Sequence, residues 1–76
     1  MEIQEFIRHF GDQFDDTDVS EFVAETNFRE LEEWSSLNAL AVINMIKKKY
    51  SVVLKPEEMK QTTTIQQLFD LVSSKL

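Results

Sequence analysis

The chain has 76 residues and a formal net charge of −6. We expect it to form a single domain over residues 1–76, because a chain of this size buries only about 60% of its unfolded surface and supports one small core. Cysteine is absent, which excludes disulfides, thiolate nucleophiles and cysteine-based metal sites. The negative charge repels phosphate backbones, so we expect no nucleic-acid partner. We also expect a monomer.

The acidic residues are concentrated in the first half of the chain. Residues 1–33 hold eleven Asp and Glu against Arg8 and Arg29, a net charge of −9, whereas residues 34–76 carry a net charge of +3. No basic stretch precedes an apolar run near the N-terminus, so we expect no leader peptide. No apolar run approaches the roughly 20 residues that cross a bilayer, so we expect a cytoplasmic protein without stable membrane insertion.

The first predicted element is a helix over residues 2–15. Its apolar residues recur at helical spacing on one face. Gly11 costs about 1 kcal/mol relative to Ala inside a helix. Phe14 extends the apolar stripe beyond Gly11, and we therefore expect the helix to continue past the glycine. The stripe comprises Ile3, Phe6, Ile7, Phe10 and Phe14.

A long acidic connection is predicted between residues 15 and 33. Hydrophobic periodicity is weak there, and only isolated apolar residues offer anchors: Val19, Phe22, Phe28 and Leu31. Loops of this length within a small domain are usually functional or mobile. The connection leads to Trp34, which we expect to anchor the chain just before Ser35 and Ser36.

The second predicted helix covers residues 36–50. Either Ser35 or Ser36 supplies a side-chain oxygen for the unpaired amides of the first turn. Lysines 47–49 lie in the last turn, where they oppose the negative end of the helix dipole. The predicted apolar face comprises Leu37, Leu40, Ile43, Ile46 and Tyr50.

The remaining elements are an extended connector, a short helix and a last helix. Val52 and Leu54 alternate with Val53 and Lys55, and Pro56 suits the first position of a short helix. Thr63 and Thr64 each precede Gln by three residues, which predicts a cap for a helix that ends near Ser74. The fold class is therefore all-α, with three main helices, a short one and a long first loop. We expect the core to contain Phe6, Ile7, Phe10, Leu40, Ile43, Ile46, Leu68 and Phe69.

The inventory of reactive groups is poor for an enzyme. A hydrolytic site needs a nucleophile, a base and an orienting group, and this chain has one His and no Cys. His9 lies on the first predicted helix, away from the main apolar stripe, and we expect no catalytic role for it. Gly11 is the only glycine, so no Gly-rich phosphate loop exists. The acidic pairs lack the spacing of a calcium loop, and we expect no metal site.

The segment Trp34-Ser35-Ser36-Leu37 resembles the signature of the acyl carrier protein family. That family has Asp-Ser-Leu at the start of its second helix, often preceded by Glu-Trp in one bacterial branch. The resemblance continues through the apolar spacing of residues 37–50, the segment 50–54 and the Thr63-Thr64 start of the last helix. It extends over nearly the whole chain.

The resemblance implies a carrier rather than a catalyst. Ser36 would hold 4′-phosphopantetheine derived from coenzyme A, with Ser35 and Leu37 as the flanking motif residues. The thiol of this arm would carry an acyl or aminoacyl group as a thioester. The implied partners are a phosphopantetheinyl transferase and acyl-activating, acyl-transferring or synthase enzymes of a lipid or specialised biosynthetic pathway.

Two departures from the family bear on these expectations. Ser35 replaces the signature aspartate, which leaves open an alternative: an unmodified helical adaptor that serves only as a docking module. The second helix also lacks the acids that family members present to basic enzymes, so we expect a dedicated set of partners. The expected docking residues are Leu37, Ala41, Met45, Lys48, Glu57 and Glu58.

Overall fold

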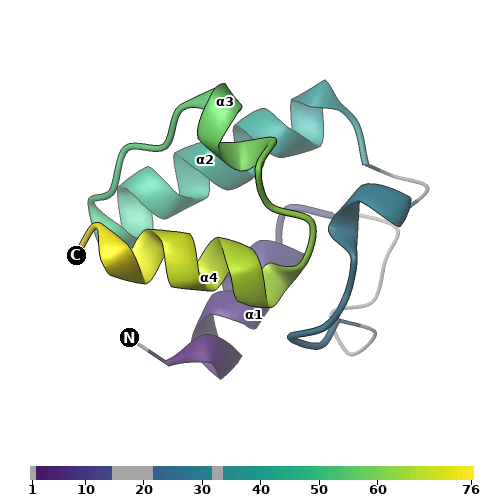
Figure 1. Cartoon of the computed structure of the whole chain (residues 1–76), viewed down its shortest axis with the longest axis horizontal. Coiled ribbons are helices and arrows are strands. Elements are labelled where there is room, and N and C mark those ends of the chain that lie inside the picture. Colours follow the sequence, from purple (N-terminus) through teal and green to yellow (C-terminus); the bar gives the residue numbers. More distant parts are fainter. Residues whose placement is uncertain (1, 15–21, 32–33) are drawn as a thin grey trace.

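The computed structural model describes residues 2–14, 22–31 and 34–76. The described parts of the chain contain four α-helices and one short 3-10 helix, in agreement with the predicted all-α class (Figure 1). Helices α2 and α4 run in the same direction across Figure 1, α3 lies above α4, and α1 lies below α4 and passes partly behind it. Within these ranges, no helix is both long and apolar enough to cross a membrane. The elements are α1 (Ile3–Gly11), η2 (Phe28–Glu30), α2 (Ser36–Tyr50), α3 (Pro56–Met59) and α4 (Ile65–Ser74).

Helix α1 ends at Gly11, so the prediction that it continues past this glycine was wrong. The amide of Asp12 still bonds to the carbonyl of Arg8 at 3.0 Å, but the amide of Phe14 bonds to Gly11 in a turn. Glycine favours this ending because it loses more backbone conformational freedom in a helix than any other residue does. Phe14 is nevertheless buried, which shows that the turn delivers this ring to the core.

Aromatic rings form the centre of the core. The ring of Phe10 lies 5.3–5.7 Å from those of Phe14, Phe22 and Phe28. Phe22 and Phe28 come from the long connection, and these two of its four predicted anchors are confirmed. Leu31 is half-buried and packs against the same core, whereas Val19 lies outside the described residues.

The predicted core is correct for α1 and mostly correct for α4, but wrong for part of α2. Leu40 is 53% exposed, and the buried residues of α2 are Val42, Met45 and Ile46. A spacing of three residues falls about 60° short of a full turn at each step. The predicted face therefore winds around the helix instead of staying on one side. Phe6, Ile7, Phe10, Ile46 and Leu68 are buried as predicted, while Ile43 and Phe69 are half-buried against the core.

Local signals in the second half of the chain are confirmed. Val52 and Leu54 are buried and Val53 is exposed, as expected for an extended connector. Pro56 begins α3. The hydroxyl oxygen of Thr64 accepts a hydrogen bond from the amide of Gln67 at 3.1 Å, which caps α4.

The described part of the long connection is fastened to the start of α4. The amide of Phe28 donates to the carbonyl of Thr63 at 3.0 Å, and the amide of Ile65 donates to the carbonyl of Thr26 at 3.2 Å. Asn27 and Thr64 form an antiparallel bridge between these hydrogen bonds. These contacts fix residues 22–31 against the bundle just before the chain reaches Trp34.

Candidate functional site

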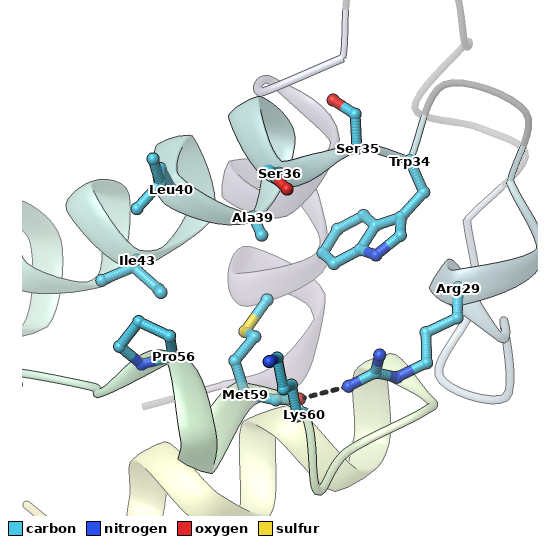
Figure 2. Close-up of a pocket in the computed structure, with 10 residues that line it drawn as sticks. All are labelled: Arg29, Trp34, Ser35, Ser36, Ala39, Leu40, Ile43, Pro56, Met59 and Lys60. Atoms are coloured by element: carbon cyan, nitrogen blue, oxygen red, sulfur yellow. Dashed lines mark hydrogen bonds between the residues drawn. The ribbon is translucent and has the colours of Figure 1, made fainter.

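Ser36 is the first residue of α2, and its side chain is exposed. The residue that caps this helix is Ser35, whose side-chain oxygen accepts a hydrogen bond from the amide of Asn38 at 3.4 Å. The same hydroxyl donates to Oδ1 of Asn38 at 2.7 Å. Figure 2 shows the Ser35 hydroxyl turned away from the pocket residues and the Ser36 hydroxyl turned toward them. The cap of α2 is therefore supplied by Ser35 and does not use the Ser36 hydroxyl.

The Ser36 hydroxyl makes no hydrogen bond to any residue that the structure describes. Its oxygen stands at the first position of a 15-residue helix, where unpaired amides and the helix dipole favour an anion. The first turn contains no acidic residue to repel such a group. A phosphate ester on this oxygen is thus electrostatically compatible with its surroundings.

Trp34 anchors the segment that precedes the two serines, as the sequence predicted. The centroid of its ring system lies 4.7 Å from the ring of Phe28, and it stacks on Phe10 with an interplanar angle of 10°. The amide of Trp34 donates to the carbonyl of Leu31 at 3.0 Å. Asn38 adds a second tie through its side-chain amide, which donates to the carbonyl of Gln13 at 3.4 Å. The start of α2 is therefore held from two directions.

A pocket of about 470 Å³ lies beside Ser36, between the start of α2 and helix α3 (Figure 2). Apolar side chains form much of its lining, and charged or polar groups complete it. The sequence did not predict this pocket, since its residues come from three separate segments. It is lined by Arg29, Trp34, Ser35, Ser36, Ala39, Leu40, Ile43, Pro56, Met59 and Lys60.

Arg29 connects the long connection to the end of α3. Its Nε donates to the carbonyl of Thr62 at 2.7 Å and its Nη2 donates to the carbonyl of Met59 at 2.8 Å. Sequence reasoning missed this role. The available signal was its isolation, because Arg29 is the only Lys or Arg between Arg8 and Lys47.

The expected docking residues on α2 do not share one exposed face. Leu37 is 79% exposed and Lys48 is exposed, while Ala41 is half-buried. Met45 is 5% exposed and belongs to the core, so the expectation that it contacts a partner is corrected. The reason is its position on α2, three residues from Val42 and next to Ile46, which places it on the buried side.

The two expected acidic docking residues on α3 differ in their surroundings. Glu57 is exposed. Glu58 forms an ion pair with Lys75, with Oε2 and Nζ 2.7 Å apart, and its other oxygen accepts from the amide of Lys55 at 3.2 Å. The hydrogen bond from Lys75 is the main cause that lowers the pKa of Glu58, followed by the one from the Lys55 amide. Glu58 is thus engaged within the chain.

Comparison with protein families matches residues 4–72 to the phosphopantetheine attachment site family. The chain therefore belongs to this family, which is the domain family of acyl carrier proteins. Searches of curated proteins and of solved structures give no significant match. The matched range includes all of the pocket and both serines of the site.

The cofactor of this family is 4′-phosphopantetheine, which is attached covalently to the protein. The residues at the start of α2 fit this group. Ser36 offers an exposed hydroxyl that is not needed for capping, and the pocket next to it is open to a bulky substituent. Domains of this kind are carriers whose chemistry is performed by partner enzymes.

Proposed function

We propose that this protein is an acyl carrier in which Ser36 holds the 4′-phosphopantetheine arm and presents acyl or aminoacyl cargo to partner enzymes. The observation that supports this most directly is that the helix cap uses Ser35 and not Ser36. Ser35 caps α2 through Asn38, and the exposed Ser36 oxygen is left available for a phosphodiester bond.

The residues of the chain contribute position and environment. The backbone amides of the first turn of α2 and the positive end of its dipole stabilise negative charge on the phosphate bound to Ser36. Trp34 and Asn38 hold the start of the helix in place. When bound, the arm supplies a thiol that carries cargo as a thioester, which a chain without cysteine cannot provide.

The partners that we propose are a phosphopantetheinyl transferase and a dedicated set of acyl-activating, acyl-transferring or synthase enzymes. Any such enzyme must approach the surface around Ser36, which includes the exposed side chain of Leu37. Helix α2 contains no acidic residue, and the lysines at 47–49 are exposed in its last turn. This charge favours enzymes whose contact surfaces are neutral or acidic.

The proposal is tested by intact mass spectrometry after incubation with coenzyme A and a phosphopantetheinyl transferase of broad specificity. We expect the wild-type protein to gain the mass of one phosphopantetheine group. Ser36→Ala should gain nothing, and the matched control Ser35→Ala should still be modified. No gain on the folded wild type, or an equal gain on Ser36→Ala, would contradict the proposal. The first of these results would favour the unmodified adaptor instead.

A further inference from the structure

The pocket beside Ser36 combines an apolar lining with two positive charges. Ala39 and Ile43 from α2 and Met59 from α3 contribute apolar surface, whereas Arg29 and Lys60 contribute a guanidinium and an ammonium group. Among the residues that the structure describes, no Asp or Glu lines the pocket. The whole chain has a net charge of −6, so its composition does not explain an excess of positive charge among the described residues of this pocket.

Arg29 is held so that part of its guanidinium remains available to the pocket. The two hydrogen bonds to the carbonyls of Met59 and Thr62 use two of its five N–H donors. Figure 2 shows the remaining terminal nitrogen directed toward the side of the pocket where Trp34 lies. The indole N–H of Trp34 makes no hydrogen bond to any described residue, and it lies on the same side.

Both charges are without a carboxylate partner among the residues that the structure describes. The single ion pair recorded within residues 2–14, 22–31 and 34–76 joins Lys75 to Glu58. Convergent donors next to an apolar surface are the pattern of a site that fixes a small ligand through a few polar contacts. The complementary ligand has a short hydrocarbon part and an anionic oxygen group.

We propose that this pocket binds cargo whose acyl chain ends in a carboxylate, and that Arg29, Lys60 and the indole N–H of Trp34 hold this carboxylate. The inference rests on the proposed carrier function and specifies its substrate class. Ala39, Ile43 and Met59 would contact the methylene groups. Charge-assisted hydrogen bonds from Arg and Lys to carboxylates are about twice as strong as neutral ones, which gives selectivity over an uncharged acyl group.

The phosphodiester of the arm is a less suitable occupant. It is bonded to the Ser36 oxygen, and in Figure 2 Arg29 and Lys60 lie across the pocket from Ser36. The pantetheine part of the arm carries no charge. An anion that meets both cations therefore comes from the cargo.

The test compares three forms of the protein modified at Ser36, carrying the free arm, an amide-linked butyryl group or an amide-linked succinyl group. Butyryl and succinyl both have four carbons and differ in the terminal carboxylate. We expect the succinyl form to shift the Trp34 indole N–H resonance and to melt about 2–5 °C above the butyryl form. Lys60→Gln should remove most of this difference. Lys49→Gln, an exposed lysine outside the pocket, should retain it.

Lys60 is a better probe than Arg29, because the hydrogen bonds of Arg29 also support α3. The proposal is overturned if the succinyl and butyryl forms have the same melting temperature and the same Trp34 resonance. It is also overturned if the free arm alone shifts Trp34 as much as the succinyl form, or if the difference survives in Lys60→Gln. A mass gain with none of the expected differences contradicts this inference only, whereas the absence of any mass gain contradicts the carrier function itself.

Discussion

The side chain of Ser35 caps helix α2 by accepting a hydrogen bond from the backbone amide of Asn38, at 3.4 Å. Ser36 follows it as the first helical residue and lies exposed. Capping satisfies an amide that would otherwise lack an intrahelical partner. The structural task at this helix start therefore falls to the residue that replaces the family's aspartate.

Ser35→Ala should consequently reduce stability without preventing modification at Ser36. Removal of an N-cap side chain costs about 0.5–2 kcal/mol of unfolding free energy. Ser35→Asp should keep the wild-type stability or exceed it, since a carboxylate also caps and interacts favourably with the helix dipole. Urea denaturation of the three proteins measures this effect. A Ser35→Ala variant as stable as the wild type would show that the cap contributes nothing.

Arg29 should contribute to stability more than a surface arginine, because it binds two carbonyls at the end of α3. Hydrogen bonds to a charged group contribute about 1.5–3 kcal/mol each, and they are not additive. We expect Arg29→Ala to lower the unfolding free energy by about 2–3 kcal/mol. Arg8→Ala is the control, since Arg8 is exposed on α1 and should change stability by less than about 0.5 kcal/mol.

Hydrogen exchange separates this effect from a general loss of packing. The amide of Thr62 bonds to the carbonyl of Met59 at 3.1 Å, next to the guanidinium of Arg29. In Arg29→Ala this amide should exchange faster under native conditions, while amides within α2 should change only by the global loss of stability. Uniform acceleration throughout the chain would contradict a local role for Arg29.

Ile46 and Leu40 differ in burial on α2 and should respond differently to truncation. Ile46 is fully buried, so Ile46→Ala should cost about 2–5 kcal/mol. Leu40 is 53% exposed, and Leu40→Ala should cost less than about 1 kcal/mol. Urea denaturation of both variants gives the comparison. Similar losses would mean that Leu40 packs in the core as its spacing in the sequence suggested.

Features set by neighbouring residues were predictable from the sequence. The bounds of α2, the proline at the start of α3 and the threonine cap of α4 each depend on contacts within a few residues. The place of Ser36 at the start of α2 was predictable for the same reason, because it follows from the residues around it. Such local preferences are visible without any knowledge of tertiary structure.

Features that depend on distant residues were not predictable in this way. The hydrogen bonds of Arg29 reach carbonyls that are 30 and 33 residues away, so nothing near Arg29 in the sequence indicates them. The pocket joins residues from three segments for the same reason. The buried side of α2 is set by which neighbours pack against it. Spacing by three residues did not define one side of the helix. Leu40 was therefore predicted in the core but is exposed, and Met45 was predicted on the docking surface but is buried.

Ser51, which ends α2, offers a stabilising substitution. Its φ angle is 58°, in the left-handed region, where residues with a Cβ atom are disfavoured. Its amide bonds to the carbonyl of Lys47 at 3.0 Å, so this conformation closes the helix. Glycine adopts it without the steric cost, although it also makes the unfolded chain more flexible.

We therefore expect Ser51→Gly to raise the unfolding free energy by about 0.5–1 kcal/mol, which corresponds to an increase of about 2–8 °C in melting temperature. Ser51→Ala is the matched control, because it removes the hydroxyl but keeps Cβ, and it should give no gain. Differential scanning calorimetry measures both variants. An equal rise in Ser51→Ala would assign the effect to the lost hydroxyl, and a lower melting temperature in Ser51→Gly would show that the flexibility of the unfolded chain outweighs the relief at this helix end.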